Sequence, residues 1–557
     1  MKAGAAIIDA LKKEGTEYVF CFPQNPLIDM AATAGIRPII SRTERATINM
    51  ADAYSRTTNG EKVGVCFVQA GPGIENAYGG IAQAAADSTP LLIIPGAPVR
   101  NRLGLPVSYD AARNYEGITK WTDVIASPAQ VEPKLRRAYT QLKNGRSKPI
   151  LLEVPVDILG EDVTGPEYRP APRAKAGANA ADVREAVKAL LSAKRPLIHV
   201  GQGVQYAQAS AELQEFVELV EVPFMTTTLA KGVIDEKHPL ACGHGGVSVT
   251  KMASTYLHSA DMIFAIGSSL STTLVSCAIP NPNEKRFVHC TIDESDIGAE
   301  YRVDHAVIGD AKLVLRQLID EAKRQIGAGP RNTGAAAEVA SIKKAYFDEW
   351  MPALTEDSEP MNPYRVIWDI YHSVDVKNTI TTHDSGNVRD QVTAMWEAPG
   401  PNSYLGWGNS TQLGTSLGMA MGAKVARPDK LCINFLGDTA FGMCGMDLET
   451  AVRERIPVLT VLINNGAMGG YDKYMPIATE KFNSRFLTGD YLKVADGLGY
   501  WAERVTKPSE IKPAVARALA VIASGRPSML ECMTKEYPSK PARATSHRHS
   551  LRRHRWR

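Results

Sequence analysis

The sequence lacks paired cysteines, long apolar runs and, near its end, acidic residues. Each absence argues against a particular kind of site or segment. Eight cysteines are scattered over 557 residues without a Cys-x-x-Cys pair, which argues against structural zinc and indicates a reducing compartment. No run of about 18 apolar residues occurs, so no membrane span is expected. The N-terminus is too polar for a secretory signal peptide. These features predict a soluble, cytoplasmic protein.

The charge is unevenly distributed along the chain. The formal net charge is +3, yet no acidic residue follows Glu536, and the tail 539–557 is strongly basic. This tail has no apolar periodicity, so we expect it to be disordered. A solvated appendage is favoured over a segment that binds nucleic acid or anionic lipid. The basic residues of the tail are Lys540, Arg543, Arg548, Arg552, Arg553, Arg555 and Arg557.

Length and composition predict a globular protein of several domains. With 44% hydrophobic and 22% charged residues among 557, the chain suits about three or four domains. Helix-like and strand-like segments alternate in residues 1–165, 181–325 and 360–538, which is typical of doubly wound parallel sheets. Residues 160–180, rich in Pro, Gly and Ala, and residues 327–361 read as linkers. The predicted fold class is therefore α/β, with three such domains.

A strand–helix–strand unit near the C-terminus places polar residues where ligands collect. Residues 430–436 and 458–463 read as buried strands, and 446–455 reads as a helix between them. Asp438 and Asn465 fall at the carboxyl ends of the two strands, where open parallel sheets bind ligands. A carboxylate and an amide oxygen suit Mg²⁺, which fills its remaining positions with phosphate oxygens and water.

The spacing of this unit resembles the diphosphate–metal motif of thiamine-diphosphate (ThDP) enzymes, a Gly-Asp-x triplet followed one helix and one strand later by Asn-Asn. The resemblance implies that Asp438, the Asn465 side chain and the Ala467 carbonyl hold Mg²⁺ on the cofactor diphosphate. The third position of the triplet is usually Gly and is Thr439 here, whose Cβ narrows the approach. An ordinary unit with a turn Asp and a capping Asn stays an open alternative.

A second motif surrounds Glu44. The segment Arg42–Arg56 (Arg-Thr-Glu-Arg-Ala-Thr-Ile-Asn-Met-Ala-Asp-Ala-Tyr-Ser-Arg) resembles a signature of the acetolactate synthase-like branch of ThDP enzymes. In that branch the Glu bonds the pyrimidine N1′ and promotes deprotonation of thiazolium C2, which needs a carboxyl group that shares a proton in a dry site. The usual His is Thr43 here, so one polar contact is absent. The alternative for Glu44 is a surface residue stabilising a helix N-terminus.

Two further segments complete the resemblance. Gly71-Pro72-Gly73 follows a buried strand and opens a helix, so its backbone can approach a ligand. By resemblance, Thr411 offers its carbonyl to the cofactor's amino group and Leu413 supports the bent cofactor, although a Leu is usually core. Asn387 falls where relatives place an amide beside the diphosphate. Further cofactor contacts implied by the resemblance are Gly437, Asp438, Thr439, Ala440, Asn465, Ala467, Met468 and Gly469.

The motifs together resemble the acetolactate synthase, pyruvate oxidase and benzoylformate decarboxylase group of ThDP enzymes, over about residues 3–537. The resemblance implies that the three α/β stretches are, in order, pyrimidine-binding, middle and diphosphate-binding domains. It also implies a homodimer or homotetramer with active sites between subunits. Glu44 of one subunit would serve the cofactor that Asp438 and Asn465 hold on the other.

The activity implied is C–C bond cleavage or formation beside a carbonyl, with ThDP and Mg²⁺. Decarboxylation of a 2-keto acid with carboligation is favoured, and the partner molecule is then a small carbonyl substrate. A lyase or hydrolase acting on an acyl-CoA or a diketone shares the cofactor motifs and stays an alternative. A non-catalytic homologue is disfavoured because Glu44, Asp438 and Asn465 are all present. The segment Met468-Gly-Gly-Tyr471 and residues 472–487 are expected to form a lid over the substrate pocket.

The sequence of the middle domain indicates less clearly whether that domain binds a ligand. Relatives bind FAD, ADP or nothing there, and flavin-binding members often carry Arg where this chain has Ser268–Thr273. An FAD-containing, pyruvate-oxidase-like enzyme is therefore possible by resemblance but disfavoured, and a purely structural middle domain is favoured. His199, in the middle of a predicted strand, is expected to be a core histidine with its hydrogen bonds satisfied.

Overall fold

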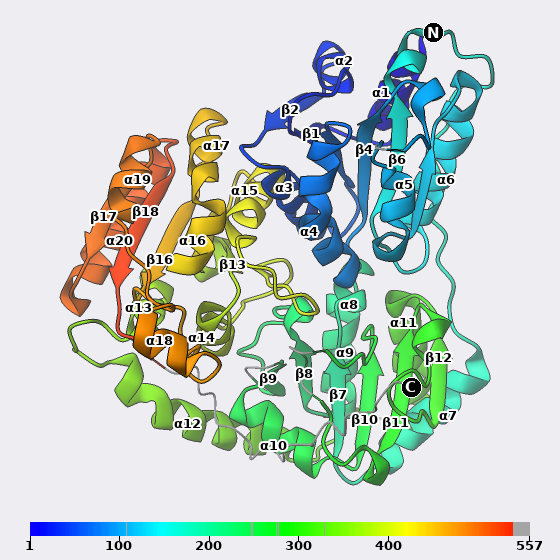
Figure 1. The fold of residues 1–557 in the computed structure, drawn as a ribbon. Coiled ribbons are helices and arrows are strands. Elements are labelled where there is room, and N and C mark those ends of the chain that lie inside the picture. Colours follow the sequence, from blue (N-terminus) through cyan, green and yellow to red (C-terminus); the bar gives the residue numbers. More distant parts are fainter. Residues whose placement is uncertain (107, 247–248, 274–275, 277, 328, 538–557) are drawn as a thin grey trace.

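Three six-stranded sheets follow one another along the chain, each in a domain of its own (Figure 1). Every strand pair within them is parallel. The fold class predicted from the sequence, three doubly wound α/β domains, is confirmed. The basic tail predicted at 539–557 lies outside the described residues. This computed structural model describes residues 1–557 except 107, 247–248, 274–275, 277, 328 and 538–557.

The N-terminal sheet has the strand order β2-β1-β3-β4-β6-β5. Its central strands are apolar along their whole length because helices cover both faces (Figure 1). The strands are β1 Tyr18–Cys21, β2 Arg37–Ile40, β3 Gly64–Val68, β4 Leu91–Ala97, β5 Trp121–Val124 and β6 Ile150–Pro155. The helices are α1 Ala3–Lys13, α2 Leu27–Thr33, α3 Glu44–Thr57, α4 Pro72–Ala86, α5 Ala111–Asn114 and α6 Val131–Lys143.

The middle sheet has the order β9-β8-β7-β10-β11-β12, which in chain order is the 3-2-1-4-5-6 arrangement of dinucleotide-binding folds. Its strands are β7 Pro196–Val200, β8 Phe224–Thr227, β9 Ala241–Gly245, β10 Met262–Ile266, β11 Arg286–Thr291 and β12 His305–Ile308. Its helices are α7 Ala180–Ser192, α8 Gly203–Tyr206, α9 Ser210–Val220, α10 Lys251–Ser259 and α11 Ala311–Ile326. Helix α12 (Ala335–Leu354) then leads to the third domain (Figure 1).

The C-terminal sheet repeats the N-terminal topology, with the order β14-β13-β15-β16-β18-β17. Its strands are β13 Thr379–His383, β14 Tyr404–Leu405, β15 Leu431–Gly437, β16 Leu459–Asn464, β17 Trp501–Val505 and β18 Ser528–Met533. Its helices are α13 Pro363–Tyr371, α14 Asn387–Met395, α15 Ser416–Ala426, α16 Asp438–Cys444, α17 Leu448–Arg453, α18 Pro476–Phe482, α19 Tyr491–Gly497 and α20 Pro508–Ala523.

The helix predicted over 446–455 was wrong in its start and its continuity. Helix α16 begins at Asp438, directly after β15, and a 3₁₀ turn at Gly445–Asp447 separates it from α17. Gly442 and Gly445 lower helix propensity, which made this stretch read as a turn. Packing outweighs that propensity, because Phe441 is buried and its ring lies 5.0 Å from the ring of Tyr491.

The first and third domains pack through α3 and α15, which lie side by side (Figure 1). Glycines on α15 permit this approach. A Cβ at Gly418 would come within 2.7 Å of Asn49 Cβ, and one at Gly422 would collide with the Met50 carbonyl. Almost every residue of α3 is buried in consequence, including its polar ones. The helix that begins at Glu44 is therefore fixed against the domain that carries Asp438.

Two sequence expectations concern the chain as a whole. No described helix combines the length and apolar character that a membrane crossing requires. All seven cysteines within the described residues are buried and free, and Cys277 lies outside those residues.

Candidate active site

The predicted site residues lie at the carboxyl ends of strands that flank the points where strand order reverses. In the C-terminal sheet, Asn387 follows β13, Asp438 follows β15 and Asn465 follows β16. In the N-terminal sheet, Gly71–Gly73 follows β3. Ligands of open parallel sheets bind at such switch points, because the loops on the two sides diverge and leave a crevice.

Asp438 and the segment after β16 face each other. The Asp438 carboxylate is buried, and its Oδ1 accepts a hydrogen bond from Thr439 N–H at 2.7 Å. Burial raises the pKa of Asp438, while the backbone N–H groups of Thr439, Gly466 and Ala467 act in the opposite direction. Asn465 Oδ1 accepts from Ala467 N–H at 3.0 Å. The structure thus brings Asp438, Asn465 and Ala467 together.

This group suits a divalent cation. Asp438 Oδ2 is buried without a hydrogen-bond partner among the described residues, and such an oxygen is costly unless something occupies it. One carboxylate, one amide oxygen and a backbone carbonyl match the oxygen ligands of Mg²⁺, which takes few protein ligands. Within the described residues no cluster of three or more His, Cys, Asp or Glu side chains offers a competing metal site.

Asn387 lies against the segment that follows Ala467. It is the first residue of α14, after Gly386 with φ +83°, and a Cβ at Gly469 would collide with its Nδ2. Met468 N–H donates to the Arg485 carbonyl at 2.8 Å, which ties this segment to the chain beyond α18. Asn387, Met468 and Gly469 therefore form one wall beside the Asp438 group.

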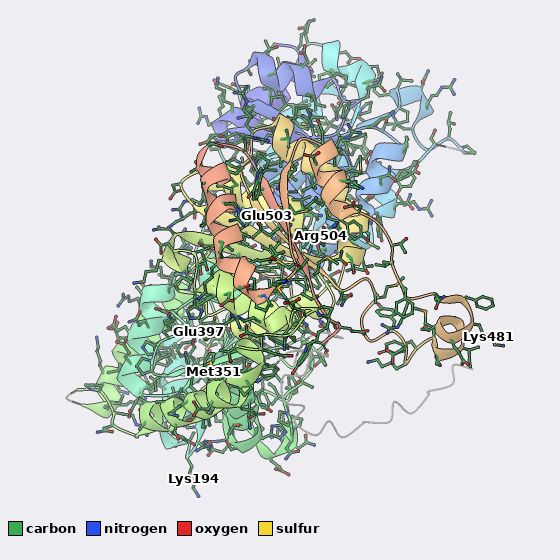
Figure 2. The ribbon with its side chains drawn as sticks, turned by 90° about the vertical axis from the view of Figure 1, so that its left-hand side faces the viewer. Lys194, Met351, Glu397, Lys481, Glu503 and Arg504 are labelled. Atoms are coloured by element: carbon green, nitrogen blue, oxygen red, sulfur yellow. The ribbon has the colours of Figure 1, made fainter. Side chains whose placement is uncertain are left out.

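The predicted lid carries exposed apolar side chains. Helix α18 stands away from the body of the protein, as Figure 2 shows at Lys481. Tyr474 is 74% exposed and Phe482 75% exposed, which is unusual for large apolar residues. Tyr471, Ile477 and Phe486 are also exposed.

Three other predicted cofactor contacts sit at the start of α16. Ala440 is buried, and a Cβ at Gly437 would have only ordinary contacts, the nearest being 3.7 Å from Val388 Cγ2. Gly437 is thus not required by space in the protein alone. The Thr439 hydroxyl lies 3.4 Å from Asp438 Oδ1, so Thr439 contacts the predicted metal ligand through both its backbone and its side chain.

Glu44 is the first residue of α3 and is 6% exposed. Its side chain hydrogen-bonds with Asn76 of α4, and a Cβ at Gly73 would lie 3.5 Å from its Oε1. Burial raises the pKa of Glu44, partly offset by hydrogen bonds from its own backbone and from Asn76. A carboxyl group of raised pKa suits proton sharing with a ring nitrogen. Glu44 therefore begins a helix and lies beside the Gly71–Gly73 turn.

The Gly71–Gly73 turn needs its glycines for different reasons. Gly71 has φ +64° at the N-terminus of α4, a conformation that L side chains rarely adopt, and Pro72 opens the helix. A Cβ at Gly73 would lie 2.8 Å from Gln69 Cβ. The turn therefore brings backbone, rather than side chains, to the surface beside Glu44.

Thr43, the residue that replaces the usual His, has a structural role. Its hydroxyl accepts from Ala46 N–H at 3.2 Å, which caps α3, and donates to Asp447 Oδ2 at 2.9 Å. Asp447 also accepts from Arg42 N–H at 2.8 Å. The start of α3 is thereby attached to the turn between α16 and α17.

Thr411 and Leu413 lie in a loop without regular structure. Thr411 is exposed and Leu413 is half-buried against the core shared by the first and third domains. The Leu413 carbonyl accepts from Arg45 Nη1 at 3.2 Å. The prediction that Leu413 is not simply core is consistent with its partial exposure.

The predicted residues form two groups within one chain. Asp438 lies with Asn465, Ala467 and the Asn387 wall, whereas Glu44 lies with Gly73 and Asn76. Within the described residues no hydrogen bond joins Glu44 to Asp438 or to Asn465.

Comparisons with known proteins agree with this arrangement. Residues 1–120 match the family model "Thiamine pyrophosphate enzyme, N-terminal TPP binding domain", 183–318 match "Thiamine pyrophosphate enzyme, central domain", and 384–532 match "Thiamine pyrophosphate enzyme, C-terminal TPP binding domain". A probable acetolactate synthase large subunit of Methanocaldococcus jannaschii is 30% identical over 95% of this chain and 91% of its own length. The chain belongs to the thiamine pyrophosphate enzyme family.

Other relatives within this family bear two names. A probable acetolactate synthase large subunit of Methanococcus aeolicus is 29% identical over 93% of this chain and 90% of its own length. A glyoxylate carboligase of Escherichia coli O157:H7 is also 29% identical, over 94% of this chain and 92% of its own length. The group recognised from the motifs is confirmed, and the chain is a ThDP enzyme of the acetolactate synthase group.

The middle domain of this thiamine pyrophosphate enzyme contains a cavity of about 530 Å³ at its switch point. Gly201 follows β7 and Gly267 follows β10, and a Cβ at Gly201 would collide with the Gly267 carbonyl. Residues 268–271 and 273 of the predicted flavin-discriminating segment 268–273 line the cavity. Basic residues of the wall are Lys143, Arg146, Lys148, Arg173 and Lys175.

His199 lines the same cavity, and the expectation of a satisfied core histidine was wrong. Its ring is 8% exposed, and Nδ1 has no hydrogen-bond partner among the described residues. Burial lowers the pKa of His199 to about 4, so the ring is neutral. The strand position was predicted correctly, but sequence periodicity does not show whether a cavity lies beside a strand.

Sequence reasoning missed three buried carboxylates near the site, Asp87, Asp384 and Asp447. Each is wholly buried and accepts backbone N–H groups from loops that carry predicted site residues. Asp384 could have been identified from the sequence, because a carboxylate directly after a strand often lies at a ligand-binding switch point. Asp87 and Asp447 gave none, because their partners are distant in sequence.

Proposed function

We propose that this ThDP enzyme requires Mg²⁺, decarboxylates a 2-keto acid and joins the remaining carbons to a second carbonyl compound. The observation that carries the proposal is the unpartnered Asp438 Oδ2, which faces Asn465 and Ala467 at the switch point of the C-terminal sheet. The relatives named acetolactate synthase and glyoxylate carboligase support the reaction type. They favour it over a lyase or hydrolase and over an FAD enzyme of the pyruvate oxidase kind.

The proposed metal ligands are Asp438, the Asn465 amide oxygen and the Ala467 carbonyl. Asn387, Met468 and Gly469 would line the diphosphate, together with the backbone at the start of α16. ThDP, when bound, supplies the carbon nucleophile and the electron sink of the reaction. The residues of the chain bind and orient it and exclude water.

Glu44 is the proposed catalytic acid–base residue. Its carboxyl group would share a proton with the pyrimidine nitrogen, and its raised pKa favours this sharing near neutral pH. Leu413 would support the bent cofactor, and the Thr411 carbonyl would accept from its amino group. Gly71–Gly73 lets backbone approach the same region.

A homodimer or higher oligomer is proposed because the two groups of site residues are separate within one chain. Met443, which lies against Gly414 and Arg45, and Met446 are about half exposed, and Tyr78 of α4 is 43% exposed. Apolar side chains at such places favour coverage by another subunit. Glu44 of one subunit would then complete the site on the other.

The test is to incubate purified protein with ThDP, Mg²⁺ and pyruvate and to follow products by NMR. Acetolactate, acetoin or acetaldehyde with loss of CO₂ would support the proposal. Glu44→Gln should lower kcat about 100-fold or more, the usual size of acid–base effects. Glu132→Gln is the matched control, since Glu132 also lies in the first turn of a helix of this domain.

Other donors distinguish the remaining alternatives. Glyoxylate should be tested beside pyruvate, because one relative is named glyoxylate carboligase. If no 2-keto acid is consumed although ThDP binds, the decarboxylation proposal is wrong and an acyl-CoA or diketone substrate takes its place.

We also propose that the middle-domain cavity holds a phosphate-bearing nucleotide ligand. The strand order, the cavity at the switch point, the basic side chains at its wall and the unpartnered His199 Nδ1 support this. Flavin absorbance in the purified protein would identify FAD. ADP should raise the Tm in the absence of ThDP, and Lys148→Met should weaken that shift. If neither ADP nor FAD changes the Tm, a purely structural role of the middle domain is favoured.

A further inference from the structure

The loop that carries Thr411 and Leu413 is not fixed by its own packing. Residues 408–415, which connect β14 with α15, contain no helix or strand. Thr411 is exposed and Leu413 only half-buried, so neither side chain holds the loop in place. Something else must determine its position.

The first support is Asp87, from the N-terminal domain. Its carboxylate is wholly buried, and Oδ1 accepts from Asn409 N–H at 3.0 Å and lies 3.4 Å from Gly408 N. Arg56 Nη2 donates to Oδ2 at 3.0 Å, and Arg56 Nη1 donates to the Gly406 carbonyl at 3.0 Å. The entry of the loop is thus attached to an ion pair inside another domain.

The second support is Asp384, directly after β13. It too is wholly buried. Oδ1 accepts from Gly414 N–H at 2.9 Å, and Oδ2 accepts from Thr415 N–H, Ser416 N–H and the Ser416 hydroxyl, each at 2.9 Å. Ser385 N–H donates to Oδ1 at 2.8 Å. No cationic side chain among the described residues forms an ion pair with this carboxylate, so backbone N–H groups and the Ser416 hydroxyl compensate its charge.

These contacts anchor both ends of residues 410–413, and Arg45 Nη1 also donates to the Leu413 carbonyl at 3.2 Å. Four residues span at most about 14 Å, so fixing both ends restricts the segment strongly. We infer that Asp87 and Asp384 are positioning residues, which hold the Thr411 carbonyl and the Leu413 side chain in place for ThDP. This inference rests on the proposed roles of Thr411 and Leu413.

At these two positions a carboxylate accepts hydrogen bonds through both of its oxygens, which an amide cannot do. Each oxygen of Asp384 faces N–H donors, whereas Asn would turn its own NH₂ group toward some of them. Two donors pointing at each other leave at least one buried N–H unpaired. The Asp→Asn substitution therefore keeps the size of the side chain and changes only its hydrogen bonding. If Asp384 and Asp87 only filled space, the substitution would have no effect.

The first test uses hydrogen exchange measured by mass spectrometry on the full chain without cofactor. We expect peptides covering 408–416 to exchange about tenfold faster in Asp384→Asn, and those covering 408–409 in Asp87→Asn. Asp369→Asn is the control, since Asp369 is buried and paired with Arg365 in the same domain but does not touch the loop. Unchanged exchange in both variants would overturn the inference.

The second test measures the Kd for ThDP with Mg²⁺, and then kcat and KM. We expect both variants to bind ThDP more weakly and to lose about 100-fold in kcat, as misplacement by about 1 Å would cause, with KM changed less. Faster exchange with an unchanged Kd and kcat would show that the contacts do not position the cofactor. Wild-type protein that fails to bind ThDP would instead contradict the proposed function.

A milder variant keeps the test decisive if Asp384→Asn does not fold. Ser416→Ala removes the hydroxyl donor to Asp384 Oδ2, together with a long contact of 3.5 Å from Asn434 Nδ2, and leaves every backbone donor to Asp384. It should shift exchange and ThDP affinity in the same direction by a smaller factor. A folded Ser416→Ala protein with wild-type exchange and wild-type affinity would count against Asp384 as a support.

Discussion

Thr43 and Asp447 join the two ThDP-binding domains within one chain, through a hydrogen bond of 2.9 Å from Thr43 Oγ1 to Asp447 Oδ2. Glu44 follows Thr43 directly, so this contact fixes the start of the helix that carries the proposed catalytic carboxyl group. The bond lies across an interface, and its loss should therefore affect stability and catalysis together.

Asp447→Ala should lower the free energy of unfolding by about 2–4 kcal/mol, because it leaves the Arg42 N–H and two hydroxyl groups without their acceptor. Activity should fall as well, since Glu44 is released at its helix end. Thermal unfolding and steady-state rates measure the two effects. Glu449→Gln, on helix α17 directly after this turn, should leave both unchanged.

Mixing two inactive variants tests where the active site lies. If Glu44 serves the cofactor of the partner subunit, a heterodimer of Glu44→Gln and Asp438→Asn has one intact site. Random mixing then restores about one quarter of wild-type activity, since half of the dimers are mixed. The subunits must first be dissociated and reassociated. Activity that stays absent after reassociation would place both residues in one chain's site.

Removal of Mg²⁺ should release ThDP. No Lys or Arg is among the proposed cofactor contacts, so the metal would be the main positive charge available to the diphosphate there. EDTA should abolish ThDP binding measured by calorimetry, and Mg²⁺ should restore it. Asp438→Asn should weaken binding in a way that excess Mg²⁺ only partly reverses. Binding that is indifferent to EDTA would contradict the metal site.

Glu153 should make stability depend on pH. It is 3% exposed on β6, its Oε2 accepts from Ala112 N–H at 3.1 Å, and burial raises its pKa to about 7. The folded state therefore binds a proton that the unfolded state has released above about pH 4.5. Stability should fall as pH rises from about 4.5 to 7, by up to about 1.4 kcal/mol per pH unit from this group.

The comparison with Glu153→Gln isolates this effect, because Gln cannot ionise. The difference in free energy of unfolding between the two proteins should change across this pH range in favour of the variant at higher pH. Denaturant titrations at several pH values measure it. Parallel pH profiles for both proteins would show that the pKa of Glu153 is ordinary.

A buried ion pair should contribute to the attachment of the middle domain to the C-terminal domain. Lys231 and Glu236 are 3% and 6% exposed and pair with each other, and Glu236 Oε2 accepts from Ala398 N–H at 2.7 Å. Lys231→Met leaves a buried charge unpaired and should cost about 3–5 kcal/mol of stability. Lys344→Met, from the exposed pair with Asp348, should cost under about 1 kcal/mol. Chemical denaturation compares them.

The fold was largely predictable because each strand is a short apolar run bounded by turn residues, and the strands alternate with helices. The positions of Glu44, Asp438 and Asn465 at element ends followed from the same patterns. Their roles, and that of Ala467, stay predictions. Helix α16 was missed because its glycines argue locally for a turn, while tertiary packing decides.

The contacts that join the domains around the site could not be predicted in this way. Asp87 meets Asn409, and Thr43 meets Asp447, only after two domains have docked, and no local pattern encodes such pairs. The cavity beside His199 is likewise a property of how loops from all three domains meet. Sequence periodicity reports which face of an element is buried but not what it is buried against.

Asp87 also contacts the middle domain, because its backbone carbonyl accepts a hydrogen bond from Gln202 Nε2 at 2.6 Å. One residue therefore touches all three domains of the chain. The loop beside it can reach its final shape only when the whole polypeptide has assembled, so cofactor affinity becomes a measure of complete folding. A chain with an undocked middle domain would retain every proposed cofactor ligand, yet we expect it to bind the cofactor more weakly.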